Sequence, residues 1–329
     1  MRAFEYLKTS SPAAAARACS GAKARYLAGG TNLIDLMKED VEQPGLLVDI
    51  NRLDLAEVRE NGTEVVLGAL VSNTDTANHP AVKERFPLLS QAILAGASQQ
   101  IRNMATNGGN LNQRTRCPYF YDTAMPCNKR VQGSGCGALG GLNRMHAIFG
   151  WSKSCVAVHP SDMCVALAAL DAKVTVLGPD GSTRTIPFAN YHRLPDESPQ
   201  KDNTLEPGEL VTQIALPANR FAKNSYYLKV RDRASYAFAL VSVAAAMELD
   251  GEVVKTARVA LGGVAHKPWR ATQAEEFLSG KKATTENFQL AAEQAVKTAR
   301  PLTENAFKVE LAKRAIVRAL EQAKKGGVV

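Results

Sequence analysis

The stretch Ala24-Arg-Tyr-Leu-Ala-Gly-Gly-Thr-Asn-Leu-Ile-Asp-Leu-Met-Lys38 carries the pattern that decides the fold. Its first four residues predict a β-strand, residues 28–32 a glycine turn, and residues 33–38 the start of an amphipathic helix. This order points successive backbone N–H groups at a phosphate, and the helix dipole adds favourable charge. Glycine pairs also serve turn geometry alone in many such connections, so the loop by itself leaves both interpretations open.

A second glycine loop, Thr106-Asn-Gly-Gly-Asn110, follows about 75 residues later. Apolar periodicity predicts a helix at residues 87–97 before it, so regular structure bounds both loops. Two loops of this kind can clamp one diphosphate from two sides. The alternative is that Asn107 and Gly108 form an ordinary tight turn, because Asn-Gly is the commonest hairpin signal.

The segment that follows holds four of the six cysteines within 39 residues and has no helical or strand period. The spacing, C-x9-C-x8-C-x18-C, fits a structural zinc site poorly, because such sites usually bring ligands in pairs roughly two to four residues apart. An iron–sulfur cube fits better, since a wide loop can supply one thiolate per iron. Two disulfides or four unrelated thiols remain as alternatives. We expect Cys19 and Cys164 to be core residues, with Cys164 as a reserve ligand.

The composition is ordinary for a globular protein. The 329 residues are 45% hydrophobic and 22% charged, and no apolar run approaches the roughly 20 residues of a membrane span. The formal net charge is +8, yet Lys and Arg are spread along the chain and no nucleic-acid recognition motif accompanies them. Bound anionic cofactors are another use for this charge.

The second half of the chain predicts two units. Strands around a turn at residues 179–181 predict a hairpin, and the polar residues 193–208 predict a surface loop. The expected domain boundary is at residues 217–224. Beyond it, the Asp250-Gly251 turn predicts a second hairpin. Helical patterns then fill residues 271–280, 285–299 and 305–325.

A set of motifs runs through nearly the whole chain. They are Leu27-Ala-Gly-Gly-Thr-Asn-Leu33, Thr106-Asn-Gly-Gly-Asn-Leu111, Pro160-Ser-Asp-Met-Cys-Val-Ala-Leu-Ala-Ala-Leu-Asp171, Glu209-Leu-Val211 and Leu261-Gly-Gly-Val-Ala-His-Lys-Pro-Trp-Arg-Ala271. In sequence and order they resemble the FAD-binding subunit, or middle domain, of the xanthine dehydrogenase family of molybdenum hydroxylases.

The resemblance implies an α+β fold. An FAD-binding domain of the PCMH or xanthine dehydrogenase medium-subunit type would span residues 1–220, in two α/β subdomains at about 1–55 and 56–220. A C-terminal domain like that of CO dehydrogenase flavoproteins, with an antiparallel sheet and helices, would span residues 221–329.

The resemblance also implies which residues bind FAD. In that family the two glycine loops hold the diphosphate, and residues matching Asp162, Leu210 and Lys229 touch the cofactor. The implied set is Tyr26, Leu27, Ala28, Gly29, Gly30, Thr31, Asn32, Leu33, Thr106, Asn107, Gly108, Gly109, Asn110, Asp162, Leu210 and Lys229. Asn32 stands where the family usually carries Asp, a change that leaves the backbone donors intact. No catalytic residue is implied.

About 45 residues, at about 114–158, intervene where most members run directly from the second glycine loop into the helix at Ser161. Similar insertions occur in 4-hydroxybenzoyl-CoA reductase and in periplasmic aldehyde oxidoreductase, where they bind a [4Fe–4S] cluster. The motifs Arg116-Cys-Pro-Tyr-Phe-Tyr-Asp122 and Met125-Pro-Cys-Asn-Lys-Arg130 look more like the aldehyde enzyme. The resemblance thus implies a cluster bound by four residues: Cys117, Cys127, Cys136 and Cys155.

The substrate chemistry is expected in another chain. This one lacks the closely spaced cysteines of a plant-type [2Fe–2S] domain and is too short to include a molybdopterin domain. The resemblance implies an electron-transfer subunit of a heterotrimeric enzyme that oxidises aldehydes, aromatic ones in particular. Its expected partners are a molybdopterin-binding large subunit and a [2Fe–2S] small subunit. FAD would pass electrons to an external acceptor, such as a ferredoxin-like protein or a quinone-like small molecule.

The N-terminal residues bear on location. Met1-Arg-Ala-Phe-Glu-Tyr6 has no continuous apolar region of a signal peptide. Because the similar enzymes are periplasmic, we expect export together with a signal-bearing partner, and a cytoplasmic location otherwise.

Two other functions compete with this one. A stand-alone flavin-dependent oxidoreductase could use the same loops, but no convincing acid–base pair accompanies them. His146 and His159 lie near the insertion, and either could be an ordinary hydrogen-bonding histidine. A basic nucleic-acid-binding protein rests on the positive net charge alone.

Overall fold

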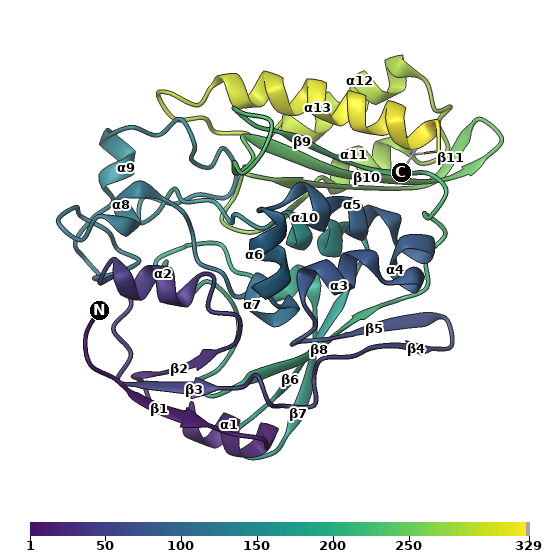
Figure 1. Ribbon diagram of the computed structural model, residues 1–329. Helices are drawn as coiled ribbons and strands as arrows, with labels where there is room; N and C mark the ends of the chain where they lie inside the picture. Colours follow the sequence, from purple (N-terminus) through teal and green to yellow (C-terminus); the bar gives the residue numbers. More distant parts are fainter. Residues whose placement is uncertain (327–329) are drawn as a thin grey trace.

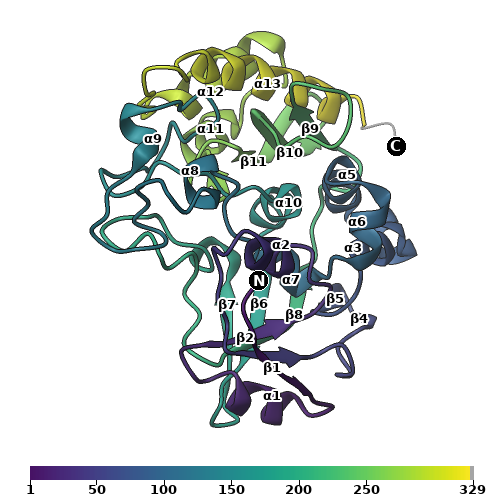
Figure 2. The ribbon, with the colours of Figure 1, turned by 60° about the vertical axis from the view of Figure 1, so that its left-hand side comes forward.

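Three β-sheets and the helices around them build the chain in a computed structural model that describes residues 1–326 (Figure 1). A parallel sheet lies at one end, a five-stranded sheet in the middle and a four-stranded sheet at the other end. Helices α5 (Pro87–Ala95) and α10 (Asp162–Ala169) pack between the last two sheets (Figures 1 and 2). Segregated sheets and helices of this kind are an α+β arrangement, as predicted.

The parallel sheet presents the first glycine loop. Its strand order is β1 (Glu5–Lys8), β3 (Leu46–Asp49) and β2 (Ala24–Leu27). Helix α1 (Pro12–Ala18) connects β1 to β2 and begins at the cap Ser11, whose side-chain oxygen accepts the N–H of Ala14. The loop after β2 leads into α2 (Leu33–Lys38). The strand, turn and helix predicted for residues 24–38 are therefore confirmed.

The five-stranded sheet is antiparallel and presents the second glycine loop. Its order is β4 (Val58–Asn61), β5 (Glu64–Gly68), β8 (Leu210–Leu216), β6 (Lys173–Leu177) and β7 (Thr183–Pro187). The remaining helical segments of this unit are α3 (Asn73–Asn78), α4 (Pro80–Arg85), α6 (Gln99–Met104), α7 (Asn107–Leu111) and the 3-10 turn η1 (Phe188–Asn190). Asn107 and Gly108 open α7, with Thr106 as its cap. The tight-turn alternative is therefore wrong.

The C-terminal unit is an antiparallel sheet with helices on its outer face. The sheet order is β12 (Trp269–Arg270), β11 (Val253–Gly262), β10 (Val241–Asp250) and β9 (Ser225–Val230). The helices are α11 (Thr272–Leu278), α12 (Thr285–Val296) and α13 (Phe307–Lys324). Gly251 adopts a φ of 58° at the β10–β11 turn, which confirms the hairpin predicted from Asp-Gly.

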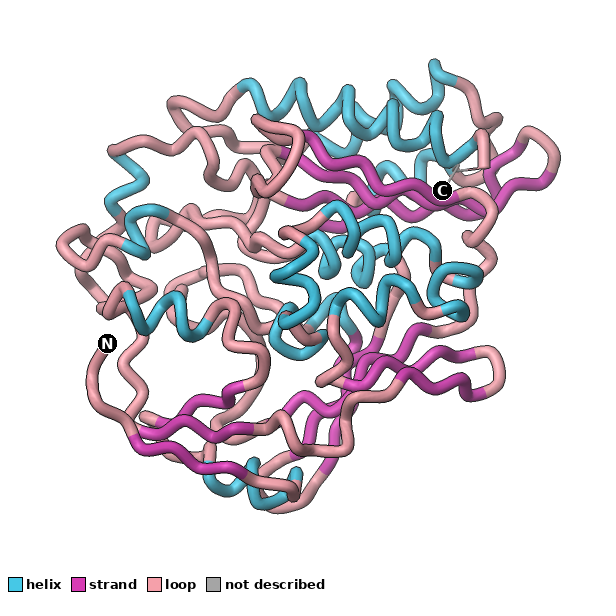
Figure 3. The backbone as a smooth tube through the Cα atoms, viewed as in Figure 1, coloured by secondary structure: helices cyan, strands magenta, loops and turns pink. Residues whose placement is uncertain are grey.

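The insertion is mostly loop (Figure 3). Its described helices are the short α8 (Pro118–Tyr121) and α9 (Gly137–Gly140). It contacts both the N-terminal and C-terminal units: Arg116 pairs with Asp35, and Asn143 accepts the N–H of Glu304. Phe120 and Cys127 of the insertion pack on Leu36 of α2 in a small apolar cluster, and Ile148 and Phe149 join the core of the C-terminal unit. None of the helices within residues 1–326 combines the length and apolarity needed to cross a bilayer.

Candidate functional site

Both glycine loops line one cleft of about 780 Å³. This volume lies within the range of pockets that hold organic ligands and cofactors. The cleft runs between the end of β2, the start of α7 and the loop that precedes β8. The predicted residues that line it are Tyr26, Leu27, Ala28, Gly29, Gly30, Thr31, Asn32, Leu33, Thr106, Gly108, Gly109 and Leu210.

The first loop offers unpaired hydrogen-bond donors. The backbone N–H groups of Gly30, Thr31 and Asn32 find no acceptor among residues 1–326. The Asn32 side chain is held by the N–H of Arg114, which donates to Oδ1 at 2.9 Å, yet its Nδ2 is buried without a partner. Buried donors without acceptors are costly in a folded protein. A bound phosphate would satisfy them, so this loop fits a dinucleotide diphosphate.

Most backbone N–H groups of the second loop already donate hydrogen bonds within the protein. Asn107 donates its N–H to Val71 O at 3.0 Å, and Gly108 to Ala69 O at 2.8 Å. Gly109 donates to the Thr106 hydroxyl at 3.2 Å. Asn107 does not line the cleft; it is fully buried and fixes the loop through its side chain. The second loop therefore shapes the cleft, and the first supplies its free backbone donors.

The glycine at position 29 lets the first loop lie against the end of α6, just before the second loop. A Cβ placed there would lie 1.8 Å from the carbonyl oxygen of Met104, at the end of α6. No side chain can be accommodated at that distance unless the first loop or the end of α6 moves. The first loop therefore depends on glycine for a close backbone approach.

Three predicted residues lie outside this cleft on the α10 side. Asp162 lines a second cavity of about 230 Å³ and accepts hydrogen bonds from Lys229 Nζ and Tyr227 OH, both at 2.7 Å. The Asp162–Lys229 pair is almost completely buried. Asn110 accepts a hydrogen bond from the Ser161 hydroxyl at 2.5 Å and so ties α7 to the start of α10. These contacts hold the second cavity beside the second glycine loop.

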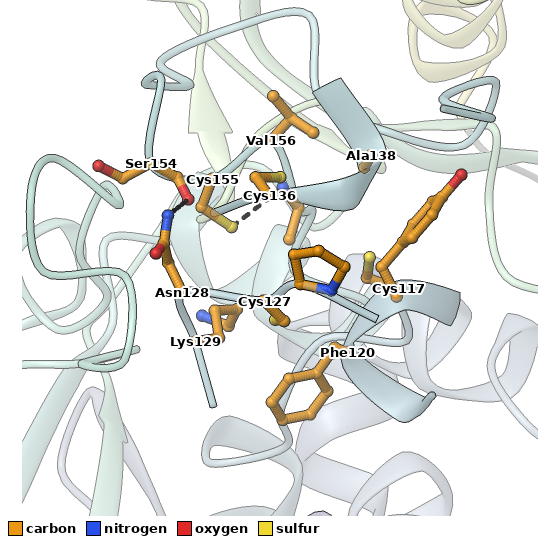
Figure 4. A pocket seen from close by; sticks show the side chains of 13 residues that line it. Cys117, Phe120, Cys127, Asn128, Lys129, Cys136, Ala138, Ser154, Cys155 and Val156 are labelled. Atoms are coloured by element: carbon orange, nitrogen blue, oxygen red, sulfur yellow. Dashed lines mark hydrogen bonds between the residues drawn. The ribbon is translucent and has the colours of Figure 1, made fainter. Parts of the chain in front are cut away.

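The four clustered cysteines meet in one small pocket (Figure 4). Cys117, Cys127, Cys136 and Cys155 all line it, although they are separated in sequence. Cys127 and Cys136 face each other in an isolated antiparallel bridge. All six cysteines of the chain are free thiols, which contradicts the disulfide alternative. Four convergent, unpaired thiols form a donor set that fits an iron–sulfur cluster.

Burial keeps two of these thiols, Cys117 and Cys155, neutral. It raises the pKa of Cys117 to about 11 and that of Cys155 to about 12. Buried neutral thiols are inert as nucleophiles, and a metal that binds them must displace their protons. Cys117 and Cys155 are therefore poor nucleophiles, and the convergence of all four cysteines in one pocket suits a metal centre.

A run of charged side chains joins the pocket to the cleft. Lys129 lines the pocket, is fully buried, and donates to Asp202 Oδ1 at 2.6 Å. Asp202 lines the cleft and accepts from Arg114 Nε at 2.9 Å. The Arg114 guanidinium stacks 4.8 Å from the ring of Phe120, a pocket residue.

Sequence reasoning missed this run. Residues 193–208, predicted to be a surface loop, in fact also close one side of the cleft and carry Asp202. The position of Lys129, two residues after Cys127, was the available signal.

His159, Cys164 and His192 form another buried cluster, with their potential ligand atoms within 4.8 Å of one another. Ser161 donates its N–H to His159 Nδ1, which places the ring proton of neutral His159 on Nε2 and leaves no lone pair there. His192 Nε2 donates to Leu111 O at 2.9 Å, so only its Nδ1 has a free lone pair. One free imidazole lone pair favours hydrogen bonding over metal binding. Cys164 lies in this cluster and not in the four-cysteine pocket.

Comparison with known proteins identifies the family. Residues 2–219 match the family described as FAD binding domain in molybdopterin dehydrogenase, and residues 226–323 match the CO dehydrogenase flavoprotein C-terminal domain. The chain belongs to the FAD-binding subunits of molybdopterin dehydrogenases. The family and the α+β fold class predicted from the sequence motifs are thereby confirmed.

Individual relatives cover nearly the full length. The chain is 49% identical over 327 residues to the aldehyde oxidoreductase FAD-binding subunit PaoB of Escherichia coli (strain K12), with 98% of this chain and 99% of that protein covered. It is 30% identical to the glyceraldehyde dehydrogenase medium chain of Sulfolobus acidocaldarius, with 85% and 82% covered. A carbon monoxide dehydrogenase chain of Hydrogenophaga pseudoflava superposes with a TM-score of 0.77 at 28% identity, with 98% of each chain covered.

Proposed function

We propose that the chain is the FAD- and iron–sulfur-containing electron-transfer subunit of a molybdenum hydroxylase that oxidises aldehydes, aromatic ones in particular, to carboxylic acids. The observation that carries this proposal is the full-length similarity to an aldehyde oxidoreductase FAD-binding subunit. The cleft and the four-thiol pocket, joined through Arg114, Asp202 and Lys129, support it. Electrons enter from partner subunits, pass through FAD, and leave to an external ferredoxin-like or quinone-like acceptor.

The first glycine loop would hold the FAD diphosphate with its free backbone N–H groups, and Leu210 would line the cleft farther along. The bound flavin would supply the one- and two-electron chemistry, while the protein supplies position and charge.

FAD binding is tested by displacing the first glycine loop from the end of α6. In Gly29→Ala the new methyl group collides with Met104 O, so we expect at least about a tenfold loss of FAD affinity, about 1.4 kcal/mol. Titration of flavin-free protein, followed by flavin fluorescence, measures this affinity. Gly45→Ala is the matched control, because its added Cβ meets Lys23 at an ordinary 3.6 Å. A folded Gly29→Ala protein with unchanged affinity would remove the first loop from the proposed site.

The four-cysteine pocket would hold one [4Fe–4S] cluster. Anaerobically purified protein should then contain about four irons and four sulfides per chain. Cys155→Ser should lower the iron content, because each thiolate serves one iron. Cys164→Ser is the matched control, since Cys164 is equally buried but lies outside the pocket. If Cys155→Ser kept all its iron and Cys164→Ser lost iron, then Cys164 and not Cys155 would be the fourth ligand.

The partners are tested by reconstitution. A molybdopterin-binding large subunit and a [2Fe–2S] small subunit should co-purify with the chain when they are expressed together. Anaerobic addition of benzaldehyde should bleach the flavin absorbance only in that complex. Rapid bleaching in the isolated chain would instead favour the stand-alone flavin oxidoreductase.

The location is proposed to be the periplasm, reached together with a partner that carries an export signal. Expressed by itself, the chain should remain in the cytoplasm, and fractionation with and without partners measures this. Appearance in the periplasm without any partner would contradict co-export.

A further inference from the structure

The sulfur of one of the four clustered cysteines contacts a histidine ring. Nε2 of His146 lies 3.1 Å from Sγ of Cys117, within hydrogen-bond distance for a sulfur acceptor. The His146 side chain is buried, and its other ring nitrogen, Nδ1, has no partner among residues 1–326. The contact with Cys117 is therefore the one hydrogen bond that this ring makes within the described chain.

The C-terminal unit sets the position of this ring. The carbonyl oxygen of His146 accepts a hydrogen bond from Asn305 Nδ2 at 3.1 Å and another from Lys308 Nζ at 3.0 Å. Both side chains are fully buried; Asn305 lies just before α13, and Lys308 lies in its first turn. The backbone N–H of His146 donates to Asn143 O at 3.0 Å. Because the main chain is pinned on both sides, a change of the side chain alone should leave the local backbone in place.

Cys117 also differs from the other three cysteines in its surroundings. It lines both the four-cysteine pocket (Figure 4) and the second cavity, which reaches Asp162 at the start of α10. His146 lines the second cavity beside it. Among the described residues, the other hydrogen bond to a pocket sulfur comes from the Ala157 backbone N–H to Cys155 at 3.4 Å. Of these two contacts, the one at Cys117 is shorter, and it alone depends on a side chain that can be substituted.

We propose that His146 is a positioning residue that donates its Nε2–H to the Cys117 thiolate and raises the reduction potential of the bound cluster. The inference rests on the proposed [4Fe–4S] cluster. A metal-bound thiolate has no proton to give, so the ring must be the donor in this pair. Uptake of one electron adds one negative charge to the cluster, and a fixed N–H dipole aimed at a ligand sulfur stabilises the more negative state.

The test compares two substitutions of His146 in the full chain. His146→Leu removes the donor but keeps an apolar side chain of similar size. His146→Gln keeps an N–H donor at about the same reach from the backbone. His79→Leu serves as the control, because His79 lies at the start of α4 and does not line the four-cysteine pocket. Iron content and the midpoint potential of the cluster are measured on anaerobically purified protein, the latter by redox titration followed by electron paramagnetic resonance.

We expect all variants to keep their iron and His146→Leu to show a cluster that is harder to reduce. A tenfold fall in the reduction equilibrium constant corresponds to a midpoint potential 59 mV lower for a one-electron couple. His146→Gln should recover most of that shift, and His79→Leu should match the original protein.

Unchanged potential in an iron-replete His146→Leu protein would overturn the inference and leave the cluster proposal intact. Equal shifts in His146→Leu and His146→Gln would also overturn it, because the N–H group would then not be the cause. If the unmutated protein contains no iron, the cluster proposal is wrong, and this inference is wrong with it.

Discussion

At the scale of single residues, the charge balance between the two candidate cofactor sites depends on Asp202. Burial by itself would raise the pKa of this carboxyl, but the neighbouring charges of Lys129 and Arg114 hold it well below its usual range. Lys129 in turn has no solvent contact and places its ammonium against Asp202, Pro199 O and His266 Nε2. A buried ammonium of this kind is tolerable only while its carboxylate partner stays ionised.

Asp202→Asn should therefore destabilise the protein by about 3 kcal/mol near neutral pH, because it leaves Lys129 buried without a counter-charge. The pKa of Asp202 is lower in the folded chain than in the unfolded chain, where it is about 3.9. Its stabilising contribution is thus fully present above about pH 4 and is lost as the pH falls below that value. Chemical denaturation of both proteins between about pH 3 and pH 7 measures the difference.

The matched control for this prediction is Asp232→Asn. Asp232 pairs with Arg144 at 2.8 Å, but both side chains are about half exposed. Exposed ion pairs contribute little to stability. Equal losses in the two variants would contradict the special position of Asp202.

At the scale of elements, the insertion is held mainly by contacts with the units on either side of it. Its helices α8 and α9 are single turns, and the apolar cluster beneath it is small. Arg130 adds order by donating to the carbonyl oxygens of Tyr119 and Phe120. Its last part is anchored, because Ile148 and Phe149 are buried in the core of the C-terminal unit. Its first part, around α8 and α9, has few packed apolar contacts, so its free energy of local opening is low unless a bound group cross-links it.

If the pocket holds the proposed cluster, removal of its iron should loosen this element selectively. We expect trypsin to cut chelator-treated protein within residues 114–158 at least about tenfold faster than untreated protein, which is about 1.4 kcal/mol of opening free energy. Peptide mass analysis over a time course identifies the cleavage sites, and cutting within the C-terminal unit serves as the internal control. Identical patterns with and without iron would show that protein contacts alone order the insertion.

At the scale of the whole molecule, the main apolar core crosses the boundary between the two matched families. Residues of the five-stranded sheet, α5 and α10 pack in the same cluster as Ala244, Ala246 and Ala260 of the C-terminal sheet. The Lys229–Asp162 pair and the Tyr227–Asp162 hydrogen bond also cross this boundary. Part of the apolar core of the FAD-binding unit is therefore formed by residues of the C-terminal unit.

A chain that ends at residue 220 should therefore fail to form a stable FAD-binding domain. Removal of β9, β10 and β11 exposes the apolar face of α5 and α10 and leaves Asp162 without its partners. Size-exclusion chromatography and thermal melting, compared with the full chain, should show aggregation and no cooperative transition. A monomeric fragment that melts cooperatively and retains FAD would show that packing across the boundary contributes little to the stability of the FAD-binding unit.

Much of this protein could be predicted from local sequence. Residues 24–38 encode a strand, a turn and a helix through short-range periodicity and glycine placement, and the structure reproduces them. Asp250-Gly251 encodes its hairpin in the same way. The four clustered cysteines were recognisable because their spacing lies in a segment that no local pattern orders.

Other features depend on residues that are distant in sequence. Asn107 and Gly108 form a tight turn in many chains, but here Thr106 caps them and the carbonyl groups of Val71 and Ala69 accept their N–H groups, so they open a helix. Lys129 meets Asp202 across 73 residues, and His146 meets Cys117 across 29. Periodicity and turn chemistry act over a few residues, so local sequence was enough to predict most helices and strands, the first glycine loop and the cysteine set. Which side chains meet follows from the packed chain, because burial and charge pairing bring together residues that are far apart in sequence.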